Sequence, residues 1–322
     1  MSRTRPLLPA LALTGALLLA ACGDDTGTGA GGSGSGAAGS GVDLSGVSIA
    51  VGSKEFTEQR VLGQIVVQAL QAAGADVEDK TNLTGTSVVR QALENGEIDV
   101  YYEYTGTGWI TILGKTDPVP GAEAQFDAVK EADAANDVTW FARAEANNTF
   151  AIAANSQATE EFGVETISDW AKVVKDDPSA GRLCSSAEFI NRNDGLPGIE
   201  KLYGFDLPAD QVVQLEPALV YNQVGAGDDC DFALVFATDG QILNNDLTVL
   251  EDDKEFFPAY NIAATMRTEV YDANSAKYDD LFGQISAELT DERLTELNAK
   301  VDVDGEAPAD VAEDFLEEAG LS

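Results

Sequence analysis

The sequence contains no histidine and few basic residues, and both shortages restrict what the protein can do. Without histidine there is no Ser/His/Asp or Cys/His nucleophile system, no imidazole metal ligand and no imidazole general base. The 19 Lys and Arg residues are outnumbered by 56 Asp and Glu residues, giving a formal net charge of −37. So large an acidic excess repels nucleic-acid phosphates and anionic lipid head groups. We therefore expect no nucleic-acid partner, no metal, no cofactor and no ordinary acid/base catalysis.

The remaining composition is that of a folded globular protein. Of the 322 residues, 44% are hydrophobic and 23% are charged. This length suits two lobes better than one core. The acidic excess also favours solubility at high ionic strength, where screening shortens the self-repulsion, so a saline habitat is our expectation.

The first 22 residues predict an export signal. Arg3 and Arg5 precede an apolar run over residues 7–21, which is shorter than the about 20 residues that span a bilayer. The small residues before Cys22 resemble a bacterial lipobox, in which the cysteine is acylated; the alternative is a chance cysteine in a simple signal peptide. Residues 23–46 are rich in Gly, Ser and Ala and predict a flexible tether. We expect a lipoprotein anchored to the outer face of the cell membrane.

The other two cysteines are Cys184 and Cys230. In an oxidising extracytoplasmic compartment they favour a disulfide. Two buried free thiols are the alternative, because a sequence does not show whether two Cα atoms come within bonding range.

From residue 47 onward, short apolar strands alternate with amphipathic helices, which predicts a largely parallel α/β fold. The expected strands are residues 47–51, 76–83, 98–104, 149–154 and 232–236, with another near Cys184. The expected helices are residues 56–73, 87–95, 167–175 and 198–203, and beyond Tyr260 the chain is expected to be helical, over residues 278–289, 293–301 and 309–319.

A weak internal repeat relates two of these segments at an offset of 132 residues. It aligns Gln91 with Gln223, Asp99 with Asp231, Tyr104 with Phe236 and Gly108 with Gly240. In each segment a strand ends on an aromatic residue, and ligands of open α/β sheets bind outside the carboxyl ends of the strands. The repeat indicates that two lobes each direct an aromatic ring into one cleft.

Six ordered motifs in this region closely resemble the substrate-binding proteins of glycine betaine/carnitine/choline ABC importers. They are VGSKEFTEQ at 51–59, GTS at 85–87, YEYTGTG at 102–108, NNTF at 147–150, DGLPG at 194–198 and ATDG at 237–240. The resemblance implies a type II periplasmic binding protein fold, with two α/β lobes, a hinge and a ligand cleft between them. It places residues 47–147 and 256–322 in the first lobe and residues 148–255 in the second. It also implies a membrane permease as partner.

A quaternary ammonium group has no N–H to donate, so aromatic faces are expected to recognise it. By motif position the family's aromatic box falls on Tyr104, Phe150, Phe236 and Tyr260. Phe150 and Phe236 stand where relatives often have Tyr, which removes two hydroxyl groups but keeps the rings.

The ligand's carboxylate needs charge-assisted donors. Matching family positions assign that role to Lys54, Thr107 and Arg192. Asn148 stands where some relatives have Asp, and the loss of a negative charge there suits a zwitterion better than choline.

The resulting prediction is an extracytoplasmic binding protein that captures glycine betaine, choline, carnitine or proline betaine and is not an enzyme. A binding protein for another zwitterion such as ectoine is the nearest alternative. An enzyme built on carboxylate pairs such as Asp228/Asp229, or a surface lipoprotein without a ligand, are the others; acidic runs more often form solvated faces.

Overall fold

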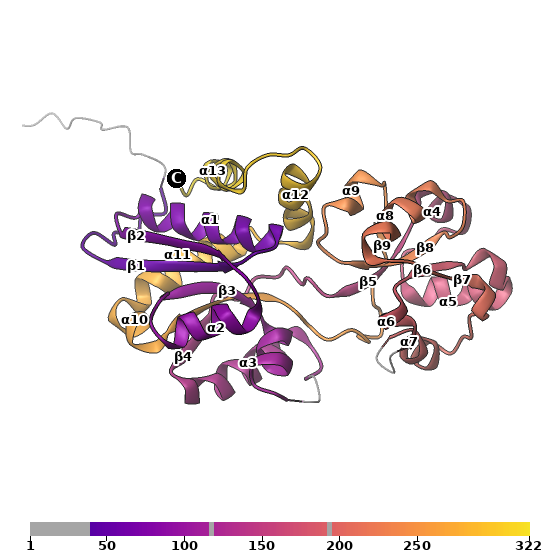
Figure 1. Ribbon diagram of the computed structural model, residues 1–322, viewed down its shortest axis with the longest axis horizontal. Helices are drawn as coiled ribbons and strands as arrows, with labels where there is room; N and C mark the ends of the chain where they lie inside the picture. Colours follow the sequence, from indigo (N-terminus) through magenta and orange to yellow (C-terminus); the bar gives the residue numbers. More distant parts are fainter. Residues whose placement is uncertain (1–38, 116–118, 192–194) are drawn as a thin grey trace, which may run out of the picture. The chain divides into compact units, whose positions relative to one another are not determined.

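The computed structural model describes residues 39–115, 119–191 and 195–322. The predicted signal segment with Cys22, the first part of the predicted tether and Arg192 lie outside these ranges. The folded part is built on two five-stranded sheets (Figure 1).

The first sheet has the strand order β2-β1-β3-β10-β4. Strand β1 pairs in parallel with β2 and β3, whereas β10 is antiparallel to β3 and β4. The strands are β1 (Ser48–Lys54), β2 (Asp76–Leu83), β3 (Val100–Tyr104), β4 (Val138–Phe141) and β10 (Ile262–Arg267). Apolar residues cover both faces: Tyr102 and Tyr104 belong to one core, and Tyr101 to another on the opposite face. Because both faces of the sheet are covered, all five residues of β3 are buried.

The helices of this half form two layers. One layer packs with Tyr102 and contains α1 (Thr57–Ala72), α11 (Ser275–Ala287), α12 (Asp291–Asp302) and α13 (Pro308–Glu318). The other side carries α2 (Thr86–Glu94) and α3 (Ala122–Asp133). The remaining elements are the π-helix η1 (Thr107–Ile112), the short η2 (Ala134–Asn136) and α10 (Thr268–Ala273). The first sheet and these helices are called the first lobe below.

The second sheet repeats this plan, with the order β7-β6-β8-β5-β9. Strand β6 is parallel to β7 and β8, and β5 is antiparallel to β8 and β9. The strands are β5 (Phe150–Ala154), β6 (Leu183–Ser185), β7 (Val212–Gln214), β8 (Phe232–Phe236) and β9 (Thr248–Val249). The helices are α4 (Ser156–Phe162), α5 (Ile167–Asp176), η3 (Pro178–Ala180), α6 (Ala187–Asn191), α7 (Leu196–Tyr203), η4 (Ala209–Gln211), α8 (Pro217–Ala226) and α9 (Gln241–Asn244). This sheet and these helices form the second lobe.

Two chain segments connect the lobes, one between β4 and β5 and the other between β9 and β10 (Figure 1). Asn147 and Asn261 form an isolated antiparallel bridge between them. The side-chain amide of Asn261 also donates to the carbonyl oxygen of Glu145 at 2.7 Å. The two crossing segments are therefore fastened to each other where they leave the first lobe.

Most of the expected elements are present within a few residues of their predicted bounds, and two expectations were wrong. The chain beyond Tyr260 is not wholly helical, because Ile262–Arg267 forms β10 inside the first sheet. The sheets are not largely parallel either, since each has two parallel and two antiparallel pairings. The second error arises because a single strand in each sheet, β10 or β5, runs antiparallel to its neighbours.

Among the described residues, no helix combines the length and the apolar character that crossing a membrane requires. Within the same ranges, no group of three or more His, Cys, Asp or Glu side chains is placed to hold a metal ion.

Candidate ligand-binding site

A pocket of about 540 Å³ lies where strands of both sheets end. Lys54 is the last residue of β1, Tyr104 of β3 and Phe236 of β8, and Phe150 begins the antiparallel strand β5. The crevice beyond the carboxyl ends of strands is the usual ligand position in open α/β sheets. Tyr104 and Phe236, the pair that the internal repeat aligned, line this one pocket from different sheets.

Seven of the eight ligand-binding residues expected from the sequence line the pocket. They are Lys54, Tyr104, Thr107, Asn148, Phe150, Phe236 and Tyr260. The eighth, Arg192, lies outside the described residues.

Two phenylalanines form the aromatic wall on the second lobe. The ring centroids of Phe150 and Phe236 are 5.0 Å apart, at an interplanar angle of 33°. They are brought together because the two residues pair across strands β5 and β8. Phe189 supports Phe150 from behind in an edge contact at 6.0 Å. Phe236 is 46% exposed, which is unusual for a large apolar side chain and leaves its ring accessible to a ligand.

Tyrosines face this wall from the first lobe. Tyr260 lies against Gly106, where a Cβ atom would come within 2.7 Å of the tyrosine ring, so only glycine permits this approach. The backbone N–H of Tyr260 donates to Oδ1 of Asn147 at 2.7 Å. The ring of Tyr104 is stacked 6.1 Å from that of Phe56, whose side chain is 42% exposed and also lines the pocket.

Lys54 is buried and paired, although the sequence suggested a donor free for the ligand. Its Nζ lies 2.5 Å from Oε1 of Glu103, and neither side chain is exposed by more than 4%. The same Nζ is 5.1 Å from the centroid of the Tyr104 ring. The ammonium group thus already donates to a carboxylate. Its other N–H groups are the ones that can donate to a ligand in the pocket.

Glu58, which sequence analysis did not select, occupies the wall beside Tyr104. Its buried carboxylate accepts hydrogen bonds from the Tyr104 hydroxyl at 2.7 Å and from Nδ2 of Asn148 at 3.0 Å. It also accepts from Thr238 at 2.5 Å and from Nδ2 of Asn298 at 3.0 Å. Burial and the charge of Glu58 raise the pKa of the Tyr104 phenol well above its ordinary value, so this hydroxyl stays protonated and remains a donor.

These hydrogen bonds also join the lobes. Thr238 follows β8 in the second lobe, whereas Glu58 and Asn298 belong to α1 and α12 in the first. Nδ2 of Asn298 also donates to the carbonyl oxygen of Thr238 at 2.7 Å. Close by, a Cβ atom on Gly240 would lie 2.5 Å from the backbone nitrogen of Ala299. Glycine at this position therefore allows the turn after β8 to approach α12.

The sequence held a signal for some of the missed residues. Phe56 and Glu58 lie inside the 51–59 motif, and Thr238 and Asp239 lie inside the 237–240 motif. Asn298, by contrast, falls in none of the six motifs, and nothing in the pattern of its amphipathic helix marks it as a pocket residue.

The described lining of the pocket carries more negative than positive charge. Glu58, Asp239 and Asp302 line it, and Lys54 is the basic residue among the described lining side chains. Burial raises the pKa of the Asp239 carboxyl above its usual value. The lining combines aromatic faces with carboxylates, an environment that suits an organic cation.

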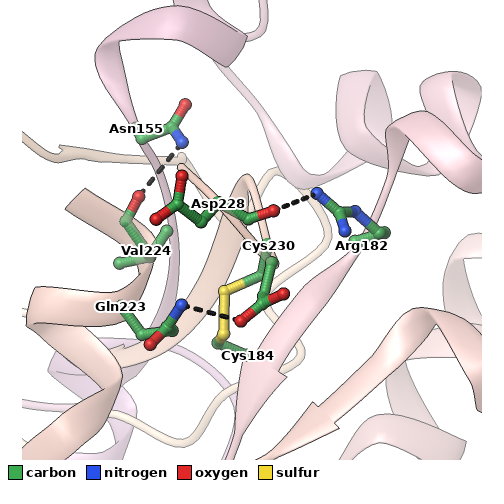
Figure 2. The surroundings of a disulfide bond; sticks show 8 residues. Asn155, Arg182, Cys184, Gln223, Val224, Asp228 and Cys230 are labelled. Atoms are coloured by element: carbon green, nitrogen blue, oxygen red, sulfur yellow. Dashed lines mark hydrogen bonds between the residues drawn. A yellow bond between two sulfur atoms is a disulfide. The ribbon is translucent and has the colours of Figure 1, made fainter. Parts of the chain in front are cut away.

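The two later cysteines are joined by a disulfide in the second lobe, with their Cα atoms 5.7 Å apart. Figure 2 shows the bond between β6 and the turn that leads into β8, surrounded by hydrogen bonds such as that from Arg182 to the carbonyl oxygen of Asp228. Both cysteines are fully buried in the core beside α8. Neither is among the described residues that line the pocket.

Comparison with known proteins agrees with this arrangement. The model of the substrate-binding domain of ABC-type glycine betaine transport systems, OpuAC, matches residues 47–318. The chain belongs to this family. The resemblance noted in the sequence is therefore confirmed, and the chain is a substrate-binding protein of the ABC importer type, which acts outside the cytoplasm.

Individual relatives match over most of their length. A glycine-betaine-binding protein of Pseudomonas aeruginosa is 36% identical over 279 residues, covering 85% of this chain and 88% of the relative. The glycine betaine-binding protein YehZ of Escherichia coli is 32% identical over 281 residues, covering 84% and 90%. The solved structure of apo YehZ has a TM-score of 0.77 and covers 85% of this chain and 99% of that one. The predicted fold class, two α/β lobes with a cleft between them, is confirmed.

Proposed function

We propose that this protein captures a quaternary ammonium osmolyte, with glycine betaine as the leading ligand, and delivers it to the permease of an ABC importer. The observation that carries the proposal is the meeting of Tyr104 and Tyr260 from one lobe with Phe150 and Phe236 from the other in a single pocket. A trimethylammonium group offers only C–H surface and charge, and aromatic faces satisfy both. Each such face contributes about 0.5–2 kcal/mol, depending on desolvation.

The carboxylate of the ligand is assigned to the polar donors that line the same pocket. Lys54 lines the pocket through a buried side chain, and Thr107 stands at the start of η1. Arg192 completes the set by motif position. In this orientation the cation lies against the rings and the carboxylate lies towards Lys54.

Closure of the lobes completes the aromatic cage, which is the name used here for the four rings that surround the ligand. The proposed lobes are residues 47–147 with 256–322, and residues 148–255, joined by the two crossing segments. Because each lobe supplies two of the four rings, a ligand is enclosed only when the lobes approach each other. The anchor is proposed to be a lipid on Cys22, followed by residues 23–46 as the tether that leaves the binding lobes free to reach the permease.

Calorimetry with the mature protein tests the substrate class. Glycine betaine, choline, carnitine, proline betaine and ectoine are titrated under identical conditions, beside a Tyr260→Leu variant that removes one ring face. We expect binding of at least one quaternary ammonium compound and weaker binding by the variant. Binding of ectoine alone would transfer the proposal to that zwitterion, and no binding at millimolar concentration would refute the substrate class.

A further inference from the structure

Glu58 stands out among the pocket residues because its negative charge is buried without a basic partner. The side chain is 3% exposed. Each of its carboxylate oxygens accepts two hydrogen bonds: Tyr104 and Asn148 donate to Oε1, and Thr238 and Asn298 donate to Oε2. In the described part of the chain, no Lys or Arg side chain forms an ion pair with it.

All four of these donors are neutral groups. An ionised carboxylate has about four acceptor positions, so the four bonds occupy its hydrogen-bonding capacity. They stabilise the charge without cancelling it, as backbone N–H groups do at an anion site. Lys54, the basic residue among the described lining side chains, is already paired with Glu103, and that pair is formally neutral. The charge of Glu58 is therefore not compensated by a cation, and it lies in the wall of the aromatic cage.

Such a carboxylate interacts with a ligand in an unusual way. Its attraction for a positive charge acts over several ångströms, and a buried site screens that attraction much less than water does. At the same time it has no vacant acceptor for an N–H donor. A quaternary ammonium group has no N–H, so it is attracted by the charge and leaves no hydrogen-bond donor unsatisfied. A protonated amine would be attracted too, but its N–H donors would find no acceptor on Glu58.

We propose that Glu58 is a specificity-determining residue of this pocket, which supplies the counter-charge of the cationic head group without forming a hydrogen bond to it. The inference rests on the proposed function, because it requires the head group to occupy the cage beside Tyr104. It adds a charged element to a site otherwise described by its rings and by the donors for a carboxylate.

Carbon isosteres separate charge recognition from shape recognition. In 3,3-dimethylbutanoate a carbon atom replaces the nitrogen of glycine betaine, so that shape and carboxylate are kept and the positive charge is lost. 3,3-Dimethylbutan-1-ol is the matching isostere of choline. The measurement is the ratio of affinities for ligand and isostere, obtained by ligand-observed NMR titration for the weak members and calorimetry for the others.

Glu58→Gln keeps the size of the side chain and removes its charge. We expect this variant to lower the ratio for both pairs at least about tenfold, with the isosteres bound as well as before or better. Equal weakening of each ligand and its isostere would show that Glu58 only shapes the pocket and would overturn the proposal. Thermal unfolding checks that the variant is folded.

Thr238→Val is the matched control, because it removes one donor to Glu58 and leaves the charge. We expect it to weaken every ligand by a similar factor and to leave the ratio unchanged. A ratio that falls as far as in Glu58→Gln would assign the effect to hydrogen-bond geometry and again overturn the proposal. If the unmutated protein binds no quaternary ammonium compound, the proposed function fails instead, which keeps the two failures distinct.

Discussion

The Nζ atom of Lys54 lies 2.5 Å from Oε1 of Glu103 in the interior of the first lobe. Glu103 also accepts hydrogen bonds from the Tyr101 hydroxyl at 3.2 Å and from the backbone N–H of Tyr104 at 2.7 Å. Lys54 therefore has two tasks, the structural one of compensating a buried carboxylate and the proposed one of meeting the ligand. Substitution of Lys54 must affect stability as well as binding.

We expect Lys54→Met to destabilise the protein by about 3–5 kcal/mol, because it leaves the Glu103 charge buried and unpaired. The double variant Lys54→Met/Glu103→Leu should recover most of this loss, since it removes both charges together. Urea unfolding measures both. A single variant as stable as the unmutated protein would contradict the buried ion pair.

The same double variant tests the ligand's orientation without the burden of an unpaired charge. If a Lys54 N–H meets the carboxylate of the ligand, glycine betaine should bind more weakly by about 1.5–3 kcal/mol, and choline, which has no carboxylate, should lose much less. Calorimetry with both ligands measures the difference. Equal losses of affinity for both ligands would show that the proposed orientation is wrong.

The aromatic cage should respond to loss of ring faces from either lobe. Leucine at Tyr104 or Phe236 keeps bulk but removes the π face, and should weaken every quaternary ammonium ligand by about 1–2 kcal/mol per ring. Tyr104→Phe is the control that keeps the ring and removes only the hydrogen bond to Glu58. If Tyr104→Leu and Tyr104→Phe weaken binding equally, the hydroxyl rather than the ring is the important group.

The sequence was informative about the strands whose ends form the pocket. Residues 232–236 were predicted as a strand with the bounds that the structure shows, and the strand ending at Tyr104 was placed correctly at its carboxyl end. Residues 232–236 are a continuous apolar run, and Val100–Tyr104 is an aromatic-rich run interrupted by Glu103 alone; short runs of this kind are typical of buried strands. The position of the two aromatic residues at one crevice then followed from the α/β pattern.

Other features could not be obtained in this way. Strand β10 is a short run of mostly small apolar residues directly followed by helix α10, and periodicity does not distinguish such a run from a helix. The pairing of Lys54 with Glu103 and the cluster of donors around Glu58 depend on side chains 46 to 240 positions apart in the chain. Their meeting is a result of the tertiary fold, and no local pattern encodes it.

The disulfide should matter for stability and little for binding. In the chain-entropy model, closing a loop with a sequence separation of 46 contributes about 4 kcal/mol. We expect Cys184→Ala/Cys230→Ala to lose a large part of this in urea unfolding, while its affinity for the ligand, measured where it remains folded, is unchanged. Free-thiol labelling of the denatured, unreduced protein should find neither cysteine reactive. Two labelled thiols would argue for the unbonded alternative.

The contact between Thr238 and Glu58 links the lobes beside the pocket, so it should help to hold a ligand once the lobes have closed. Thr238→Val keeps the shape of the side chain and removes one hydrogen bond to a charged acceptor. We expect affinity to fall by about 1.5 kcal/mol, roughly tenfold, for glycine betaine and choline alike. Because the bond forms between lobes and not to the ligand, the loss should appear as faster dissociation in stopped-flow measurements, with association little changed. Small-angle scattering should also show a smaller degree of closure at a given ligand concentration.

Thr86→Val is the matched control for this change. Thr86 lines the same pocket but begins α2, within the first lobe, and so removal of its hydroxyl deletes a polar group of the wall without touching the contact between Thr238 and Glu58. We expect dissociation from this variant to remain close to that of the unmutated protein. A hydrogen bond between the lobes predicts faster ligand dissociation for Thr238→Val alone. If both substitutions accelerate dissociation to a similar degree, ligand retention depends on the hydroxyl groups of the pocket in general, and the proposed role of the contact between lobes is wrong.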